Sequence, residues 1–302
     1  MPITYYHVVF TVPATIARIA YQNPILIYKL LFGATAQTLT TIAADPKHLG
    51  VKIGFTAVLH TWDSALTHHP HLHCVVPGGG LTHEGVWKPC KKGFFLPVRV
   101  LSRLFRRLFL QKLMALHSQL SFYGEIAQLS DINAFRSYLA PAHKVDWVVY
   151  AKRPFAGPKA VFEYLSRYTH RVAISNSRIT QYDTQTVTFK WKDYRAKDSQ
   201  RMKTMTLSAN EFLRSLLIHI LPHRFHRIRH YGLFANHQRK QNLKVLQKAL
   251  CPATPMVDEQ ADVDESTDKT SSSSPKFVCR TCGTTMVIIE TLLQHQQPRD
   301  PP

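Results

Sequence analysis

The stretch at residues 69–77 reads HPHLHCVVP and sets two histidines, His71 and His73, on either side of a leucine. Residues 71–77 have the apolar composition of a strand, in which side chains two positions apart point to the same face. His71 and His73 therefore share one face, and Leu72 and Cys74 point to the other, which we expect to be the core. Two imidazoles on one face can bind a divalent cation. The alternative interpretation is a polar strand edge that faces solvent.

Further histidines surround this pair. Six of the 17 histidines lie between residues 60 and 83. His60 stands near the end of a predicted strand at 51–62, and its imidazole reaches the same site if that strand pairs with 71–77. We therefore expect His60 to be the third metal ligand, with Asp63 and Glu163 as the alternatives.

The rest of the pattern predicts a mixture of strands and helices, and therefore an α+β fold. Strands are expected at 3–12, 51–62, 71–77, 145–151, 185–192 and 202–207, and helices at 14–43, 99–120, 159–169 and 208–220. The last helix begins with Ser208 as its N-cap and has Glu211 three residues later, which is the pattern of a capping box. The triplet Gly78-Gly79-Gly80 predicts a turn after the histidine strand.

The charge of the chain is strongly positive and uneven. The net charge is +19 in total. Residues 1–257 hold 34 Lys/Arg and 11 acidic residues, a net charge of +23. Such a body attracts polyanions, so nucleic acid is the first expected partner and an anionic membrane the second. The alternative is a basic protein whose charge only keeps it soluble.

The cysteines and the apolar segments of the sequence indicate the cellular compartment of the protein. The five cysteines are scattered and odd in number, which favours a reducing cytoplasm over a disulfide framework. We see no uninterrupted apolar run of membrane-spanning length and no signal peptide. The expected location is the bacterial cytoplasm, in association with the nucleoid, so of the two polyanions we expect nucleic acid as the partner and not a membrane.

A pair of tyrosines follows in the segment 161–172, which reads VFEYLSRYTHRV. Tyr164 and Tyr168 are four residues apart, so they share one face of the predicted helix. Arg167 and Arg171 have the same spacing and lie beside them. A tyrosine with a pKa of about 10 is a poor nucleophile, but a cation that polarises a phosphate lowers that barrier. Read alone, two tyrosines at this spacing usually serve packing.

Three regions divide the chain. Residues 1–250 carry the pattern of a folded domain, and 251–278 have the composition of a disordered linker, rich in Pro, Asp, Glu, Thr and Ser. Residues 279–302 form a short tail that contains Cys279 and Cys282. This CxxC is half of a zinc site, which Cys251 and His295 could complete; the alternative is a tail with two free thiols.

The histidine and tyrosine motifs together resemble the HUH superfamily of single-strand endonucleases. More narrowly, the chain resembles the two-tyrosine rolling-circle transposases of the insertion-sequence-91 type over about residues 3–235. The resemblance is carried by His60-Thr61-Trp62, by 69–80 (HPHLHCVVPGGG), by 164–173 (YLSRYTHRVA), and by Leu221-Pro222 and 227–232 (RIRHYG).

This resemblance implies a palm of antiparallel strands with flanking helices, and a transposase that cleaves and rejoins single-stranded DNA through a 5′-phosphotyrosine. It implies His71 and His73 as ligands of Mg²⁺ or Mn²⁺, Tyr164 and Tyr168 as successive nucleophiles, and single-stranded transposon ends and target as the substrate. Such transposases usually begin with a cysteine- and histidine-rich zinc segment, whereas the first strand predicted here starts at residue 3. We therefore expect a truncated or split copy of the family.

Two basic segments are further candidates for DNA contact. Residues 223–240 contain five Lys/Arg and four histidines but no acid, interleaved with Phe225, Tyr231 and Phe234. This is a typical pattern for binding single strands, with a basic helix whose aromatics lie in the core as the alternative. The residues expected to contact DNA are Arg167, His170, Arg171, Arg227, Arg229, Arg103 and Arg107, with Arg99 and Arg106 on the same helix as the last two.

Other functions fit parts of the same pattern. A plasmid replication initiator or conjugative relaxase shares the HUH motif, and a catalytically inactive DNA-binding remnant shares the basic surface. A histidine-metal hydrolase would need a carboxylate base, for which Asp63 and Glu84 are the candidates near the cluster. The combined motifs favour the transposase.

Overall fold

The structure is a computed structural model that describes residues 3–93, 95–152, 173–193 and 202–250. The contacts of the chain divide it into two units, Met1–Thr254 and Pro255–Pro302, and the second lies outside the described residues. The first unit is α+β with a central antiparallel sheet, as the sequence predicts. The finer division into 1–250, 251–278 and 279–302 stays a prediction.

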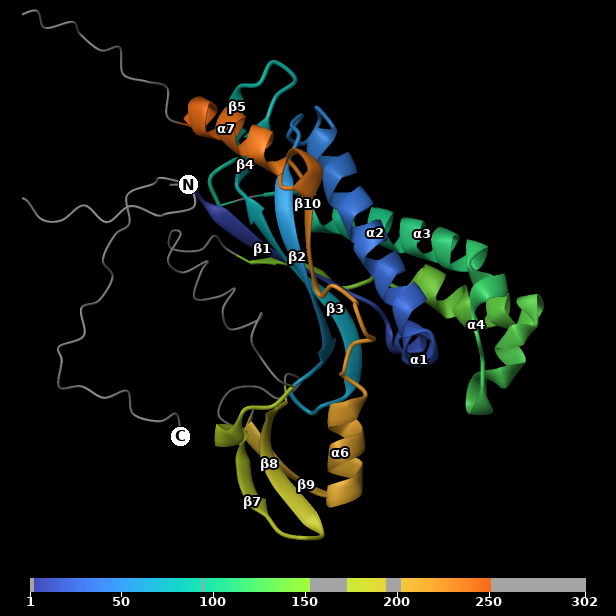
Figure 1. Cartoon of the computed structure of the whole chain (residues 1–302). Coiled ribbons are helices and arrows are strands. Elements are labelled where there is room, and N and C mark those ends of the chain that lie inside the picture. Colours follow the sequence, from blue (N-terminus) through green and yellow to red (C-terminus); the bar gives the residue numbers. More distant parts are fainter. Residues whose placement is uncertain (1–2, 94, 153–172, 194–201, 251–302) are drawn as a thin grey trace, which may run out of the picture. The chain divides into compact units, whose positions relative to one another are not determined.

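A five-stranded antiparallel sheet organises the first unit (Figure 1). Its strand order is β10-β2-β3-β1-β6. The strands are β1 (Tyr5–Thr11), β2 (Gly54–Trp62), β3 (His68–Pro77), β6 (Val149–Lys152) and β10 (Ile228–Gly232). Because β1 and β2 both pair with β3, the histidine strand lies in the middle of the sheet with a partner on each side.

Four helices lie on one side of this sheet (Figure 1). They are α1 (Ala14–Gln22), α2 (Pro24–Ala44), α3 (Val98–Ala115) and α4 (Ile132–Lys144). The single helix predicted at 14–43 is wrong, because the chain breaks at Asn23 before Pro24. Proline lacks an N–H and disfavours the helical conformation in the residue before it. Asn23 instead donates from Nδ2 to the carbonyl of Ser121 at 2.8 Å, which ties the break to the loop after α3. Helix α4 was not expected from the sequence.

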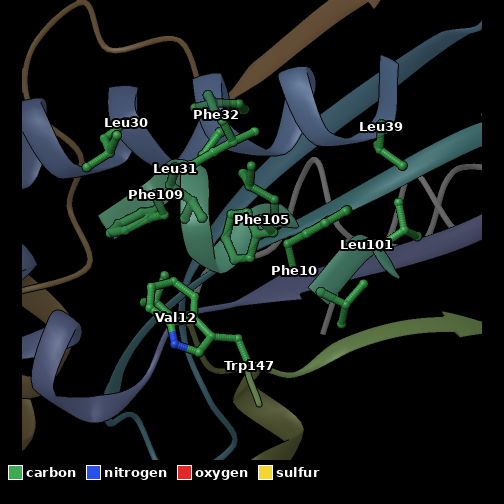
Figure 2. Close-up of a cluster of buried hydrophobic side chains, with 14 of the residues drawn as sticks. Phe10, Val12, Leu30, Leu31, Phe32, Leu39, Leu101, Phe105, Phe109 and Trp147 are labelled. Atoms are coloured by element: carbon green, nitrogen blue, oxygen red, sulfur yellow. The ribbon is translucent and has the colours of Figure 1, made fainter. Parts of the chain in front are cut away.

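The main core fills the space between these helices and the sheet (Figure 2). Phe105 of α3 packs edge-on against Phe10 of β1 and Trp147, with ring centroids 5.1 and 5.4 Å apart. Each such buried ring stabilises the fold by about 1.5–3 kcal/mol. Leu72 and Cys74 of β3 are fully buried in the same core, so the histidine strand rests on a packed layer.

Helix α2 is the one described helix whose length and apolar composition would allow it to cross a membrane. In the most apolar window of this helix, 56% of the residues are buried inside the protein. Leu31 and Phe32 belong to the main core, and α2 packs against α3 and β3. A core helix of this kind meets the same criteria of length and composition.

Two smaller layers complete the described chain. Strands β7 (Ile179–Tyr182), β8 (Thr186–Lys192) and β9 (Met202–Ser208) form a sheet that packs with α6 (Ala209–Leu217). Strands β4 (Gly79–Leu81) and β5 (Trp87–Pro89) pair near α7 (Arg239–Leu250). Short 3-10 turns occupy His117–Gln119, Gly124–Ser130, Asn176–Arg178 and Asn236–Gln238.

The local predictions for these layers are partly confirmed. Ser208 caps α6 by accepting a hydrogen bond from the Glu211 N–H, as predicted, but the Glu211 carboxylate bonds Arg214. The glycine triplet does not make the expected turn, because Gly79 and Gly80 belong to β4. A Cβ at Gly80 would lie 2.5 Å from the Lys52 carbonyl oxygen, so glycine there permits a close approach of two backbones. Strands β7 and β10 and helix α7 were not expected.

Candidate metal centre

Strand β3 presents its two histidines on the sheet face opposite the helices. In the register of the sheet, His71 lies beside His60 of β2, and His73 lies between Val58 of β2 and Val9 of β1. The intervening Leu72 and Cys74 point into the helix-side core, as the alternation of the sequence predicts. The pairing of β2 with β3 thus brings His60 to the pair from the neighbouring strand.

A β-bulge shapes the start of this strand. Between the pairs His60–His71 and Trp62–His68, two residues of β3 oppose one residue of β2. One of the two is Pro70, which has no N–H for the ladder and therefore suits a bulge. The bulge leaves the His69 carbonyl free to accept a hydrogen bond from His71 Nδ1 at 2.6 Å. Since a carbonyl only accepts, Nδ1 of His71 carries the proton and Nε2 has the lone pair that binds metals.

The three imidazoles converge on one point. Their ring centroids are 5.5 Å apart for His60–His71, 4.4 Å for His60–His73 and 4.8 Å for His71–His73. One nitrogen from each ring lies within 4.8 Å of the other two. Nitrogens about 2.1 Å from a shared metal would be roughly 3–3.5 Å apart, so small rotations of the rings would complete a site.

Burial keeps the His71 imidazole in the neutral form that binds a cation. His60 and His73 are buried, and His71 is partly buried. Burial lowers the pKa of His71 to about 4, against the opposing effect of the His69 carbonyl. A neutral imidazole is the form that binds metals, so His71 needs no deprotonation at neutral pH. The donor set therefore fits a divalent cation.

A fourth histidine, His7 of β1, joins the cluster from the other side of β3. Its Nε2 lies 2.8 Å from Nδ1 of His73, and the two rings stack with centroids 5.0 Å apart and planes 11° apart. No motif in the sequence marks His7 as a site residue. It is the one histidine in the predicted strand 3–12, but only the order of the strands shows that this strand lies beside β3.

Aromatic and polar contacts hold the outer side of the cluster. Trp62 stacks on His60, with ring centroids 5.0 Å apart. His219, in the turn after α6, packs against Trp62 and lies 3.2 Å from the Thr61 hydroxyl through its Nδ1. Its Nε2 lies 3.1 Å from the Leu66 carbonyl and donates to it. These contacts connect α6 to the hairpin that follows His60.

The alternative carboxylate ligands lie elsewhere. Asp63 accepts hydrogen bonds through Oδ1 from the N–H groups of Ala65 and Thr67, both at 2.9 Å, so it caps the β2–β3 turn. Glu84 lies in an exposed hairpin next to His83. Among the described residues, the group that can hold a metal consists of histidines alone, and Glu163 lies outside them. The described part of the chain thus brings no carboxylate base to the cluster, as a hydrolase would need.

The predicted DNA contacts fall in three places. Arg103 and Arg107 are exposed on α3, which covers the sheet face opposite the histidines. Arg106 of that helix donates to the Val145 carbonyl and pairs with Asp146. The guanidinium of Arg229 lies 4.3 Å from the centre of the Phe32 ring, on the helix side of the sheet. The backbone of Arg227 accepts a hydrogen bond from Leu59 at the edge of β2.

The aromatics of residues 223–240 serve packing. Phe225 and Tyr231 pack against the main core, and Phe234 packs in the small cluster around Leu81 and Leu246. Predicted site residues outside the described part of the chain are Tyr164, Arg167, Tyr168, His170 and Arg171, together with the zinc candidates Cys279 and Cys282. Their roles stay predictions.

A basic α+β protein with a histidine cluster on one sheet face fits a nucleic-acid enzyme with a candidate metal centre. The sequence profile of the family Y2_Tnp, described as "Putative transposase", matches residues 54–242, which is more than half of the chain. The chain belongs to this transposase family, which confirms the resemblance seen in its motifs. The matched residues include the three clustered histidines and both predicted tyrosines, whereas His7 precedes them.

Two curated relatives are similar over most of the chain. "Putative transposase y4qJ" of Sinorhizobium fredii (strain NBRC 101917 / NGR234) is 56% identical over 268 residues, which are 88% of this chain and 67% of the relative. "Transposase for insertion sequence element IS801" of Pseudomonas savastanoi pv. phaseolicola is 30% identical over 251 residues, which are 82% of this chain and 58% of the relative. The chain thus spans about two thirds of the first relative and less of the second. No solved structure matches.

Proposed function

We propose that this transposase cleaves and rejoins single-stranded DNA in rolling-circle transposition, with a divalent cation at His60, His71 and His73. The observation that carries the proposal is the convergence of these three imidazoles, each with one nitrogen within 4.8 Å of the others. Membership of the transposase family supports a DNA substrate. The chain covers 67% and 58% of the two relatives, so transposition by this protein is also part of the proposal.

The cation proposed is Mg²⁺ or Mn²⁺. Imidazole ligands suit Mn²⁺ better than Mg²⁺, which prefers oxygen, so phosphate and water oxygens are expected to complete the shell. When bound, the cation polarises the scissile phosphate and offsets the charge that develops during attack. Three neutral ligands leave the full charge of the cation available to the phosphate.

Tyr164 and Tyr168 are the proposed nucleophiles. The phenolic oxygen of one tyrosine attacks the phosphorus, which forms the O–P bond of a 5′-phosphotyrosine and breaks the bond from phosphorus to the 3′ oxygen. The tyrosine loses its proton, and the departing 3′ oxygen gains one. Because a phosphodiester bond is kept, a 3′-hydroxyl can reverse the step and rejoin strands without a nucleotide cofactor. Two tyrosines permit one cleavage at the transposon end and another at the target or the opposite end.

The basic charge of the chain fits this substrate. The proposed phosphate contacts near the reacting DNA strand are Arg167, His170, Arg171 and Arg227. An arginine side chain can donate two parallel hydrogen bonds to the oxygens of one phosphate. Binding should weaken steeply with salt, since each phosphate contact releases counterions. We propose that the protein acts in the bacterial cytoplasm, in association with the nucleoid.

A denaturing gel tests the proposal. The purified chain is incubated with labelled single-stranded oligonucleotides from transposon ends and Mg²⁺ or Mn²⁺, and a covalent protein–DNA adduct is expected. The adduct should vanish with a chelator and in the Tyr164→Phe/Tyr168→Phe double variant. A matched control is Tyr123→Phe/Tyr182→Phe, which removes two tyrosines that are 66% and 78% exposed outside the site.

The outcomes separate the alternatives. An adduct that persists in the Tyr164→Phe/Tyr168→Phe variant contradicts the choice of nucleophiles. Tight binding to every end sequence with no adduct contradicts the enzyme and favours a DNA-binding remnant. Cleavage at a plasmid origin in place of a transposon end would favour a replication initiator or relaxase.

A further inference from the structure

His7 and His73 form a buried pair of imidazoles, of which His73 alone belongs to the candidate metal centre. The two residues come from neighbouring strands, and in the register of β1 with β3, His73 lies opposite Val9, two positions from His7. Residues two apart share a face, so both histidines point to the side of the sheet that carries His60 and His71. The exposed fractions are 3% for His7 and 8% for His73, so water hardly competes for the contact between them.

Metal binding by His73 would fix which of the two rings donates the hydrogen bond between them. His73 faces His7 with Nδ1, at 2.8 Å from His7 Nε2, so His73 would bind a cation through its other nitrogen, Nε2. An imidazole that binds a metal through Nε2 must carry its proton on Nδ1. His73 Nδ1 therefore donates to His7 Nε2, and His7 carries its own proton on Nδ1. If His7 donated instead, the proton of His73 would sit on Nε2 and block the ligand.

The two ligands of β3 differ in how their protons are fixed. His71 donates to the backbone carbonyl of His69, a group that can only accept. His73 depends on a side chain that can either donate or accept. The state of His7 therefore decides whether His73 can act as a ligand, whereas His71 is set by the backbone of the bulge.

We propose that His7 is a positioning residue for the metal centre, which orients His73 and holds it in the Nδ1-protonated form. The proposal rests on the proposed metal-dependent function, and it adds a residue that lies before the segment matched by the family profile. Hydrogen-bond partners of metal ligands typically change metal affinity by about 10–100-fold when they are removed. His7 accepts the hydrogen bond as a neutral group, so it fixes the geometry without adding negative charge to the site.

Metal binding without DNA tests this role. Mn²⁺ affinity is measured by electron paramagnetic resonance of free Mn²⁺ for the wild type, His7→Phe, His7→Gln and His71→Ala. Phenylalanine keeps a ring but removes the acceptor, and the glutamine side-chain oxygen lies close to where Nε2 of histidine would be. His7→Phe should weaken Mn²⁺ binding by about tenfold or more, and His7→Gln should recover most of the loss. His83→Phe, in the exposed hairpin, is the control for the loss of one histidine.

Thermal unfolding in a chelator is measured on the same proteins, to separate folding from metal binding. If His7→Phe folds as the wild type does and binds Mn²⁺ equally well, the role of His7 is refuted, while the metal centre stands. If the wild type itself binds no Mn²⁺, or His71→Ala binds as tightly as the wild type, the metal centre of the proposed function fails, and the role of His7 with it.

A second measurement avoids the variant if His7→Phe does not fold. Nuclear magnetic resonance of the wild type labelled with ¹⁵N-histidine reports which ring nitrogen carries the proton. The expected result is protonated Nδ1 and unprotonated Nε2 for both His7 and His73 in the metal-free chain. A proton on Nε2 of His7 with unprotonated Nδ1 on His73 would overturn the proposal.

Discussion

Trp62 stacks on His60 with ring centroids 5.0 Å apart and planes 9° apart. Such a pair contributes about 0.5–1.5 kcal/mol beyond the area it buries, which corresponds to roughly a 2- to 12-fold change in an equilibrium. We predict that Trp62→Leu weakens Mn²⁺ binding within that range, because the His60 ring loses its support, and that Trp62→Phe largely retains the affinity. Trp191→Leu, in the small sheet, is the matched control. Equal affinity in Trp62→Leu and the wild type would contradict the prediction.

Asp63 should behave as a turn cap and not as a ligand. Its Oδ1 accepts two backbone hydrogen bonds at 2.9 Å, which asparagine can also accept. We predict that Asp63→Asn leaves Mn²⁺ affinity unchanged. Asp63→Ala should lose about 1 kcal/mol of stability, or roughly 2–4 °C in the unfolding midpoint, as for the loss of a helix cap. His60→Ala should abolish binding in the same assay. A folded Asp63→Asn protein that fails to bind Mn²⁺ would make Asp63 a ligand after all.

Acid should destabilise the metal-free chain through its buried histidines. Burial lowers the pKa of His68 and of His71 to about 4, whereas a histidine in the unfolded chain titrates near 6.5. Between these values the unfolded state binds protons that the folded state does not, so stability is lost as the pH falls from about 6.5 to 4. Each such histidine contributes up to about 1.4 kcal/mol per pH unit in this window.

His68→Gln tests this pH dependence. Glutamine can still bond the Tyr28 hydroxyl, which lies 2.9 Å from His68 Nε2, but it does not titrate. We expect a flatter dependence of the unfolding midpoint on pH between 4 and 6.5 for this variant in a chelator, and an unchanged slope for the exposed His83→Gln. The slope is the readout, because the substitution itself can shift stability at every pH. Parallel curves for His68→Gln and the wild type would disprove the assignment.

Arg229 should act mainly in folding. Its guanidinium lies over Phe32 and Phe225, at 4.3 and 5.0 Å from the ring centres. Cation–π contacts of this kind contribute about 0.5–2 kcal/mol, depending on how dry they are. We predict that Arg229→Leu lowers the unfolding midpoint while the salt dependence of binding to a short oligonucleotide stays the same. A shallower salt dependence, by about 0.7 in the logarithmic slope, would restore Arg229 as a phosphate contact.

The sequence could predict what is local. The alternation of His71, Leu72, His73 and Cys74 fixes which side chains face the core, because a strand leaves no other arrangement. Ser208 as a helix cap is equally local. Pro24 indicates a helix break at the residue before it, but the apolar pattern on both sides of the proline favoured a single helix.

The sequence could not predict what depends on pairing between distant segments. Residues 228–232 look like a basic surface segment, yet they form β10 because β2 offers a free edge. The contact of His7 with His73 joins residues 66 positions apart and depends on β1 lying beside β3. The bulge at Pro70 orients the His71 ring, because the ring donates a hydrogen bond to the His69 carbonyl. A pattern of side chains does not reveal such a backbone contact.

Arg103 and Arg107 lie on α3, one of the helices on the side of the sheet opposite the histidine cluster. A short DNA strand bound at the histidines therefore cannot contact both arginines directly. A longer DNA strand can pass around the sheet and reach them. We predict that Arg103→Gln/Arg107→Gln leaves binding of an oligonucleotide of roughly 10 nucleotides unchanged and weakens binding of one of roughly 40. For the longer strand, the logarithmic salt slope should fall by about 1.4, since two phosphate contacts are lost.

Fluorescence anisotropy at several salt concentrations measures both slopes. Lys91→Gln/Lys92→Gln removes the same charge from two exposed lysines beyond β5, so it controls for the change in net charge. If the loss of net charge caused the weaker binding, both double variants would bind the short and the long oligonucleotide less tightly, and to the same extent. Equal losses for the short and the long strand in Arg103→Gln/Arg107→Gln alone would mean that α3 contacts the strand at the site itself, and the assignment of α3 to a separate stretch of DNA would be wrong.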